Sequence, residues 1–379
     1  MKILLVQDRL RSGGTERQAV LLANAFAAAG HAVALLTFRP GGPLAGTVAP
    51  AVARLVLQPF DLGLDWFAPG LVAAARRFDP DVVLCLGRMA NCYAGGLQSA
   101  LPRAAVLGTM RTGKPLPFLF RRSLQRVRHI VANSRDAAAT LARAYGVDPA
   151  RVTVILNSLV FPAEPPPSAV PPSGPPAPAA PPASALRIRF GATPATSVLL
   201  CVAMFRPEKN QRELIEIAAG LPAGADWQLW LAGDGPARAE CEALAAAQGL
   251  GGRIKFPGFL RDPSELYRAA DVAVHASSSE ALSNFLIEAQ AHGLPVVACA
   301  AQGIGECFVP GHTGWEIARG DHAAFRARLG ALAAAAPAER AARAAAARRF
   351  ARESFDPARQ VEAYLALFAR LRGDSAPAR

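Results

Sequence analysis

Residues 280–297 read EALSNFLIEAQAHGLPVV, with glutamates at 280 and 288 and the apolar run GLPVV at the end. Ser283 is suited to cap the helix that follows it, and the next residues supply the unpaired backbone N–H groups of a first helical turn. A helix N-terminus of this kind attracts phosphate. The segment therefore predicts a loop, a helix and a buried strand, with an anion site where the helix begins.

The spacing of the two glutamates carries little information by itself. Glu208 and Glu216 are also eight residues apart, and a chain with fifteen glutamates is expected to contain such a pair by chance. The capped turn and the apolar strand behind it are what distinguish the pair at 280 and 288.

Apolar runs typical of β-strands alternate with helical segments along both halves of the chain. The expected strands lie at 3–6, 33–37, 82–86, 105–107, 130–132, 152–156, 198–202, 228–231, 254–256, 272–275 and 296–299. The expected helices lie at 14–29, 136–145, 211–219 and 237–247, in the segment that carries Glu288, in an Ala/Arg-rich stretch, and at 360–371. This order predicts α/β structure with parallel, doubly wound sheets.

Length and composition predict two domains with a spacer between them. At 379 residues the chain exceeds the size at which one hydrophobic core keeps growing. Eleven of residues 162–182 are proline, which favours an extended segment over packed structure. The predicted parts are 1–161, 162–185, 186–355 and 356–373. Two such domains would leave a cleft at the carboxyl ends of both sheets, the usual ligand site in open α/β folds.

The net charge of +12 is concentrated in the first part of the chain. Residues 1–161 hold 19 Lys and Arg against 8 Asp and Glu, and residues 82–135 hold nine basic residues and no acid. This asymmetry favours an anionic partner, either lipid headgroups or nucleic acid. Nucleic acid is disfavoured, because no binding signature is visible and Tyr93 is the one tyrosine or tryptophan near the basic stretch.

Targeting and metal signals are absent from the sequence. No apolar run reaches the length of a membrane span, and Met1 leads into the first strand without a signal-peptide pattern, so we expect a cytoplasmic protein. The six cysteines form no C-x-x-C pair, which argues against a zinc site and a disulfide framework. No D-x-D or metal-ligand cluster occurs in a suitable loop, so no metal and no cofactor are expected.

Residues 205–210, FRPEKN, hold one of only four lysines, Lys209, between a predicted strand and a helix. A Lys or Arg at the end of a strand can neutralise a departing diphosphate, although an isolated lysine is more often a solvated charge. Gly13 and Gly14 open the first helix, where they form either a ligand loop or a plain helix-start turn. His275 is interpreted as a bystander, because no Asp or Ser partner is recognisable beside it.

Together these elements resemble the retaining GT-B glycosyltransferases of family 4. The resemblance rests on residues 13–37, 130–158, 205–210, 231–236 and 254–297, and on the final helix; the block at 254–297 is the most specific. It implies two Rossmann-like domains that face a central cleft. The acceptor would bind in domain 1–161 and the nucleotide sugar in domain 186–355, while helix 356–373 would cross back to the first domain.

The resemblance also assigns roles to individual residues. Glu288 would hold the ribose hydroxyls, Glu280 would bind the donor sugar, and Lys209 would stabilise the leaving diphosphate. On the donor side it further implies the backbone amides of Asn284, Phe285, Leu286 and Ile287, beside the N-cap Ser283, and a base near Gly258, Phe259 and Leu260. Gly233 lies in a turn that either shapes the nucleotide pocket or is a plain βα turn, and Arg206 is a candidate second cation. On the acceptor side the resemblance implies Gly13 and Gly14, while Arg88, Arg111 and Lys114 are candidate acceptor contacts because they lie in the acid-free basic stretch.

Three positions depart from the family pattern. Met204 stands where an arginine is common, and Arg206 is the candidate replacement. Ala281 replaces a usual glycine beside the donor sugar, which would narrow the pocket. The run Asn157-Ser158-Leu159-Val160 replaces a common Asn-Gly-Val-Asp and precedes the proline-rich insertion.

The implied activity is retaining, metal-independent transfer of a hexose from a nucleotide diphosphate sugar, with UDP favoured and GDP second. The acceptor would be a glycan or a lipid-linked glycan used in cell-surface polysaccharide or glycolipid synthesis. Residues 117–128 predict either an interfacial basic helix, with peripheral contact to the inner membrane face, or a surface helix packed on the sheet. The alternatives are a sugar-nucleotide epimerase and a catalytically silent GT-B binding protein.

Overall fold

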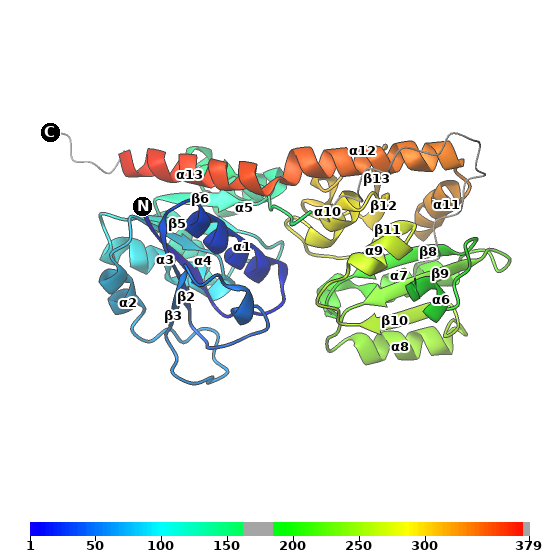
Figure 1. Ribbon diagram of the computed structural model, residues 1–379, viewed down its shortest axis with the longest axis horizontal. Helices are drawn as coiled ribbons and strands as arrows, with labels where there is room; N and C mark the ends of the chain where they lie inside the picture. The colour runs from blue at the N-terminus through cyan, green and yellow to red at the C-terminus, as the bar shows by residue number, and fades with distance from the viewer. Residues whose placement is uncertain (162–184, 374–379) are drawn as a thin grey trace, which may run out of the picture. The chain divides into compact units, whose positions relative to one another are not determined.

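The computed structural model describes residues 1–161 and 185–373. It divides into two compact units, unit 1 (Met1–Ser158 and Phe355–Arg379) and unit 2 (Leu159–Ser354). Each unit contains one parallel β-sheet (Figure 1). The predicted linker at 162–185 lies outside the described residues except for Ala185, where helix α6 begins.

Unit 1 holds a seven-stranded sheet with the order β3-β2-β1-β4-β5-β6-β7, and all its pairings are parallel. Its strands are β1 Lys2–Gln7, β2 Ala32–Thr37, β3 Ala53–Val56, β4 Val82–Cys85, β5 Ala105–Met110, β6 His129–Ala132 and β7 Val152–Val154. Its helices are α1 Gly14–Ala28, α2 Leu71–Phe78, α3 Arg88–Ala100, α4 Phe118–Arg126, α5 Arg135–Tyr145 and α13 Pro357–Gly373, with short 3₁₀ turns η1 Ala45–Thr47 and η2 Pro149–Arg151.

Unit 2 repeats the architecture with a six-stranded parallel sheet, in the order β10-β9-β8-β11-β12-β13. Its strands are β8 Ser197–Val202, β9 Trp227–Ala232, β10 Ile254–Gly258, β11 Val272–His275, β12 Val296–Cys299 and β13 Gly314–Ile317. Its helices are α6 Ala185–Arg189, α7 Gln211–Ala219, α8 Arg238–Ala247, α9 Ser264–Ala269, α10 Asn284–Ala291, α11 His322–Ala333 and α12 Pro337–Phe355, with 3₁₀ turns η3 Pro207–Lys209 and η4 Ile304–Glu306.

The prediction of a doubly wound α/β fold is confirmed, because each unit is a Rossmann-like domain with one parallel sheet. Every strand that the alternation predicted is present. The sequence patterns missed strands β3 and β13 and helices α2, α3, α6, α9 and α11. The edge strand β3 has no fully buried residue, so it lacks the apolar run that marks a buried strand.

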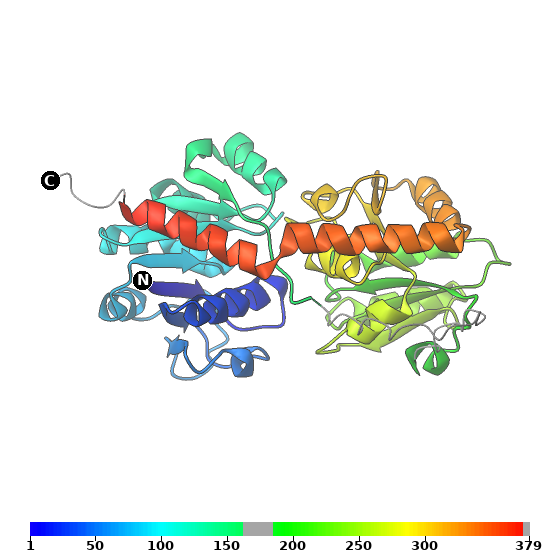
Figure 2. The ribbon, with the colours of Figure 1, turned by 45° about the horizontal axis from the view of Figure 1, so that its top comes forward.

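Helix α13 completes the core of unit 1. It lies along one face of the sheet beside α1, as Figure 2 shows. Phe26 of α1 makes edge-to-face contacts with Tyr364 and Phe368 of α13, at ring-centroid distances of 6.0 and 5.6 Å. All three rings are fully buried, and complete burial of such a side chain is worth about 2 to 3 kcal/mol.

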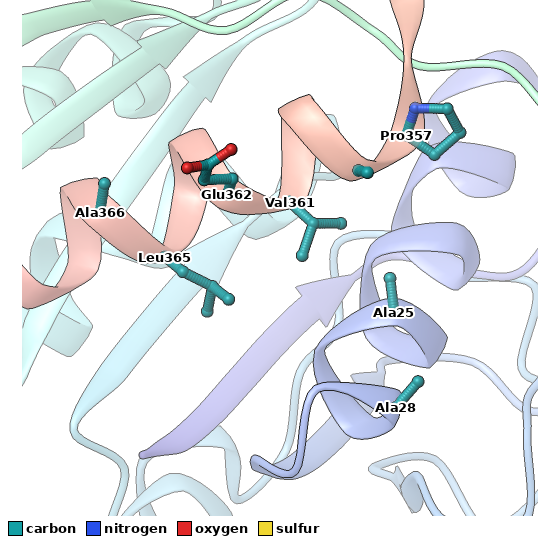
Figure 3. A pocket seen from close by; sticks show the side chains of 8 residues that line it. Ala25, Ala28, Pro357, Val361, Glu362, Leu365 and Ala366 are labelled. Atoms are coloured by element: carbon teal, nitrogen blue, oxygen red, sulfur yellow. The ribbon is translucent and has the colours of Figure 1, made fainter.

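The apolar residues of 360–371 predict an amphipathic helix with one face formed by Val361, Tyr364, Leu365, Phe368 and Leu371, and this prediction is partly correct. Tyr364, Phe368 and Leu371 are buried together with Leu367, which the pattern left out. Val361 and Leu365 instead line a shallow apolar groove between α1 and α13 (Figure 3). Compared with the predicted face, the helix therefore buries one additional side chain, Leu367. Two predicted side chains, Val361 and Leu365, are only partly buried.

Candidate functional site

The carboxyl ends of β8 and β11 meet where the chain changes direction across the unit 2 sheet. After β8 the chain builds β9 and β10 on one side, and β11 then pairs with β8 on the other. Open α/β sheets bind ligands at such a switch point. Lys209 follows β8 and Glu280 follows β11, so the topology brings two residues 71 positions apart into contact.

Lys209, Glu280 and His275 form a hydrogen-bonded cluster at this point. The Lys209 ammonium donates to Oε1 of Glu280 at 2.5 Å, and Nε2 of His275 lies 3.0 Å from the same oxygen. Burial alone raises the pKa of Glu280, but the charge of Lys209 and the hydrogen bond with His275 outweigh it and lower the pKa to about 2. Glu280 is therefore a carboxylate at neutral pH.

The interpretation of His275 as a bystander is incomplete. Its hydrogen-bond partner is Glu280, five residues later, and not an Asp or Ser. His275 is 1% exposed and ends strand β11, so its side chain is held within the sheet edge. A polar residue at the end of an otherwise apolar strand, shortly before a carboxylate, is the signal that could have found it.

The backbone next to Lys209 is fixed by a second polar cluster. Asn210 has a left-handed conformation (φ 51°), and its amide donates to Glu213 at 2.6 Å. Glu213 is 8% exposed and also lies 3.8 Å from Arg319 and 3.4 Å from His322. These contacts hold the turn between η3 and α7, which sets the direction of the lysine side chain.

The loop that carries Glu280 is bonded to the segment that carries Lys209. The carbonyl of Glu208 accepts from the backbone N–H of Ser278 at 2.8 Å and from the hydroxyl of Ser277 at 2.9 Å. Arg319 donates to the carbonyl of Ser277 at 3.3 Å. The two halves of the candidate site are therefore coupled through backbone groups as well as through the ion pair.

Helix α10 begins where residues 280–297 predict it. Ser283 is at the N-cap position, as predicted. Its hydroxyl makes no capping hydrogen bond, so that part of the prediction is wrong. Asn284 opens the helix, and Phe285, Leu286 and Ile287 bury their side chains while their backbone forms its first turn. The GLPVV run is a strand only from Val296 onward, since residues 293–295 form the turn after α10.

Glu288 lies in α10 and accepts a hydrogen bond from the hydroxyl of Tyr267 at 2.7 Å. Tyr267 is 2% exposed and stacks on His292 with ring centroids 4.6 Å apart. The tyrosine therefore orients one carboxylate oxygen of Glu288. Sequence reasoning missed Tyr267, whose aromatic character is also typical of a plain core residue.

Two glycines let loops approach the site closely. Gly233 has φ 134°, and a Cβ there would lie 2.0 Å from the carbonyl oxygen of Ala203, in the loop after β8. Gly303 has φ 71°, and a Cβ there would lie 1.8 Å from the carbonyl oxygen of Ala281, next to Glu280. Any larger residue at either position would displace a loop that borders the cluster.

The remaining donor-side candidates lie at the edge of the same sheet. Gly258 ends β10 and its carbonyl accepts from the N–H of Gly233 at 2.9 Å. Phe259 and Leu260 follow it and are 48% and 37% exposed. Arg206 precedes η3 and is partly buried; within residues 1–161 and 185–373 its side chain forms no ion pair.

The acceptor-side candidates all lie in unit 1. Gly13 and Gly14 form the start of α1, where a Cβ on Gly13 would lie 2.5 Å from Oε2 of Glu16. Arg111 donates to Asn157 at 2.6 Å and to the hydroxyl of Tyr364 at 2.9 Å, so it ties α13 to the sheet. Lys114 lies in the loop between β5 and α4, and Arg88 donates to the carbonyl of Pro115 at 2.9 Å.

Unit 1 has its own switch point, between β1 and β4, and Asp8 occupies it. The Asp8 carboxylate accepts from the N–H groups of Met89 and Ala90 at 3.0 and 2.7 Å, so it caps α3. Burial raises the pKa of Asp8 to about 6, although both backbone hydrogen bonds oppose the shift. Asp8 was not predicted, because a lone Asp after a strand has no distinguishing neighbours in the sequence.

Helix α4 corresponds to the predicted basic segment 117–128. Two of its apolar side chains, Phe120 and Leu124, are buried in unit 1 at 2% and 1% exposure, and the helix packs along α3. The other two, Phe118 and Leu119, are 66% and 58% exposed. Of the two alternatives, the packed surface helix is the one that the structure supports. The predicted contact with the membrane stays a prediction.

Two features are absent from the described ranges 1–161 and 185–373. No group of three or more His, Cys, Asp or Glu side chains is arranged there to hold a metal ion. No helix in those ranges combines the length and apolar character needed to cross a membrane.

Comparison with known proteins identifies the family. The model for glycosyl transferases group 1 matches residues 186–349, and the model for glycosyltransferase family 4 matches residues 12–159, so together they span most of the chain. A lipopolysaccharide core biosynthesis glycosyltransferase, LpsE of Rhizobium meliloti, is 36% identical over 35% of this chain and 38% of its own length. A D-inositol 3-phosphate glycosyltransferase of Rhodococcus opacus is 31% identical over 55% of this chain and 48% of its own length.

The chain thus spans less than half the length of these curated relatives. Solved structures agree in fold over almost the whole chain. Anabaena HepE, in a complex with UDP-glucose, has a TM-score of 0.76 at 20% identity and covers 98% of this chain and 100% of its own. WaaG, a glycosyltransferase involved in lipopolysaccharide biosynthesis, has a TM-score of 0.71 at 20% identity and covers 97% and 99%. The chain belongs to the GT-B glycosyltransferases of the group 1 and family 4 type.

Proposed function

We propose that the protein transfers a hexose from a nucleotide diphosphate sugar to a glycan or lipid-linked acceptor, with retention at the anomeric carbon and without a metal. The observation that carries this proposal is the Lys209–Glu280–His275 cluster at the switch point of unit 2, a short distance in sequence before the N-terminus of α10. It combines a cation for a leaving diphosphate with a carboxylate for sugar hydroxyls.

Each group has a role set by its chemistry. The lysine ammonium and the N–H groups of residues 284–287 would stabilise the negative charge that develops on the departing diphosphate. Glu280 stays ionised and would accept hydrogen bonds from the donor sugar. Glu288, oriented by Tyr267, would accept from the two ribose hydroxyls. Arg206, half-buried beside η3, would supply the second cation in place of Met204.

Retention would follow a front-face course. As the bond between the anomeric carbon and the diphosphate oxygen lengthens, the departing phosphate can accept the proton of the attacking hydroxyl, so no carboxylate nucleophile is needed. Glu280 fits this course because its ion pair with Lys209 makes it a positioning group and a weak base. UDP is the preferred donor nucleotide, in keeping with the UDP-glucose bound to Anabaena HepE, and GDP is second.

The acceptor would bind through unit 1. The basic residues of 82–135, among them Arg88, Arg111 and Lys114, favour an anionic or lipid-linked glycan. Gly13 and Gly14 would let it approach the backbone. The location proposed for the reaction is the cytoplasmic side of the cell membrane, where such acceptors are presented.

The test is turnover of donor by purified wild type and two variants, Lys209→Ala and Glu288→Ala. We expect slow hydrolysis of one UDP- or GDP-sugar by the wild type, found first by a thermal-shift panel because a specific ligand stabilises the folded state. Hydrolysis should fall by at least a hundredfold in Lys209→Ala, whereas Lys255→Ala, a lysine on β10, should match the wild type. Equal turnover in all four proteins would overturn the catalytic assignment.

The stereochemistry and metal independence need separate measurements. With an identified acceptor, proton NMR of the product should show the anomeric configuration of the donor, and inversion would refute the front-face course. Activity should persist in excess EDTA. An epimerase would instead convert the donor sugar with no acceptor present, and the same NMR experiment would detect it.

A further inference from the structure

His275 ends strand β11 in the interior of unit 2, beside the proposed donor site. It is 1% exposed, its backbone pairs with Ala298 of β12, and its ring lies against Phe285, with ring centroids 5.8 Å apart. Its Nε2 atom lies 3.0 Å from Oε1 of Glu280. The strand that begins Val-Ala-Val therefore ends in a polar ring that is held in place and directed at one carboxylate oxygen.

The charge of Glu280 determines which nitrogen of His275 carries hydrogen. Burial opposes ionisation, but the charge of Lys209 and the contact with His275 lower the pKa of Glu280 to about 2, so its oxygens only accept hydrogen bonds at neutral pH. Nε2 is then the N–H donor. Within the described residues Nδ1 is buried and has no hydrogen-bond partner, so a second N–H there would be unsatisfied. The geometry therefore favours a neutral ring with its hydrogen on Nε2.

Both hydrogen bonds that Glu280 accepts are made to the same oxygen. Lys209 donates to Oε1 at 2.5 Å and His275 to Oε1 at 3.0 Å, and within residues 1–161 and 185–373 no donor reaches Oε2. Burial raises the pKa of the neighbouring thiols of Cys201 and Cys307, so these are neutral and bring no further charge to the carboxylate. Glu280 is 9% exposed, which leaves Oε2 as the oxygen available to a ligand.

His275 restrains this carboxylate in a way that Lys209 does not. A lysine ammonium is a compact charge on a flexible stem, and it can bond either oxygen of a carboxylate. The imidazole ring, held in a strand, offers one N–H in one direction. Without it the carboxylate of Glu280 could turn about its final bond and still keep the ion pair. His275 is therefore the group that decides which oxygen is presented to a ligand.

We propose that His275 is a positioning residue for the donor sugar: it holds Oε1 of Glu280 so that Oε2 accepts a hydrogen bond from one sugar hydroxyl. The inference rests on the proposed function, in which Glu280 binds the donor sugar, and adds how that sugar is selected. A carboxylate oxygen left without a donor is costly, so a sugar that lacks this hydroxyl is disfavoured. The effect of His275 is on the sugar and not on the nucleotide.

The test compares two amide side chains that differ in reach. The side-chain N–H of glutamine falls near the position of Nε2 in histidine, whereas that of asparagine falls near Nδ1. His275→Gln should therefore retain the hydrogen bond to Glu280, and His275→Asn should lose it. His129, on β6 of unit 1, gives the matched control His129→Asn. It is also buried in a strand, at 4% exposure, and its Nε2 lies 2.8 Å from the hydroxyl of Thr153.

Calorimetry on the full chain gives the dissociation constants. The ligands are the UDP- or GDP-sugar that most stabilises the wild type, the same nucleoside diphosphate without sugar, and analogues that each lack one sugar hydroxyl. One analogue should bind about tenfold or more weakly than its parent to the wild type, His275→Gln and His129→Asn, because a hydrogen bond to a charged group is lost. In His275→Asn the two should bind within about threefold of each other. The nucleoside diphosphate alone should bind all four proteins equally, which also shows that they are folded.

Heteronuclear NMR of the wild type, labelled at its histidine nitrogens, observes the ring directly. The resonances of His275 are those that disappear in His275→Gln, and they should show hydrogen on Nε2. A ring that carries hydrogen on Nδ1 alone could not donate to Glu280 and would overturn the proposal. This measurement requires no ligand, so it decides the question of the donor even if His275→Asn does not fold.

Two binding results would also overturn the proposal. The first is a penalty for the deoxy analogue in His275→Asn that equals the penalty in the wild type. The second is equal binding of every analogue and its parent by the wild type. Failure of the proposed function is distinguishable, because the wild type would then bind no nucleotide sugar at all, and this inference would fall with it.

Discussion

Removal of the Lys209–Glu280 contact should cost unit 2 a measurable part of its stability. The ammonium lies 2.5 Å from the carboxylate, and the two side chains are 25% and 10% exposed. An exposed ion pair contributes about 0.2 to 1 kcal/mol, whereas breaking a fully buried one costs about 3 to 5 kcal/mol. The intermediate burial of Lys209 places the expected coupling at about 2 kcal/mol.

A double-mutant cycle isolates this coupling from the other effects of each substitution. The variants are Lys209→Met, Glu280→Gln and the pair, each in a Trp66→Phe background. The three remaining tryptophans, at 227, 230 and 315, all lie in unit 2, so their fluorescence in urea follows that unit alone. The control cycle uses Arg238 and Glu242, a surface pair at 2.7 Å with 30% and 44% exposure, and should give about 0.3 to 0.5 kcal/mol.

The pH dependence supplies an independent check. The pKa of Glu280 in the folded protein is lowered from 4.5 to about 2. The stabilisation that its carboxylate gives to the folded state is therefore fully present above pH 4.5 and is lost as pH falls toward 2. The shift corresponds to about 3 kcal/mol, shared between Lys209 and His275. In Glu280→Gln this acid-dependent loss should disappear. A Lys209–Glu280 coupling below about 0.5 kcal/mol would refute the reasoning. So would a loss of stability between pH 4.5 and 2 in Glu280→Gln that equals that of the wild type.

Three further outcomes are expected. Tyr267→Phe removes the hydrogen bond to Glu288 and should weaken nucleotide binding by about 1 kcal/mol in calorimetry; unchanged affinity would exclude an orienting role. Gly303→Ala should destabilise unit 2 by about 3 kcal/mol in urea denaturation, because the new Cβ would clash with the carbonyl oxygen of Ala281. The control Gly311→Ala has a similar φ of 73° but open space around the new Cβ, and it should cost about 1 kcal/mol. Equal costs for the two variants would contradict the predicted clash. Burial raises the pKa of Asp8 from 3.8 to about 6, so the free energy of unfolding should fall by up to about 3 kcal/mol as pH rises from 4 to 7. In urea titrations of Asp8→Asn this pH dependence should be absent. If it persists, another group is responsible for it.

Local patterns were sufficient for most of the fold. Buried parallel strands are short apolar runs, and helices such as α1 and α5 begin and end at residues that the periodicity marks. Strand β3 and helix α9 were missed because an exposed edge strand and a six-residue helix are too short to show a period. The beginning of α10 was predictable, but the missing Ser283 hydrogen bond depends on side-chain orientation.

The candidate site divides along the same line. Lys209, Glu280 and Glu288 could be named from the sequence because each lies in a motif next to a strand end or a helix start. Tyr267 could not, because an isolated tyrosine in an apolar stretch looks the same in sequence as a core residue. His275 was named, but its contact with Glu280 was not predicted. Contact between a side chain and a carboxylate far along the chain is decided by strand order, here by the pairing of β8 with β11.

The loop between β3 and α2 shows the same limit on the surface of unit 1. By itself the sequence determined the α/β class, the two doubly wound halves and the basic character of residues 82–135, because these depend on composition and on short-range periodicity. Its motifs carried the resemblance to glycosyltransferases. Only the tertiary structure decided that the apolar face of α4 is buried, that the side chains of 60–67 are exposed, and that Lys209 meets Glu280, because burial and contact depend on which distant segments the fold packs together.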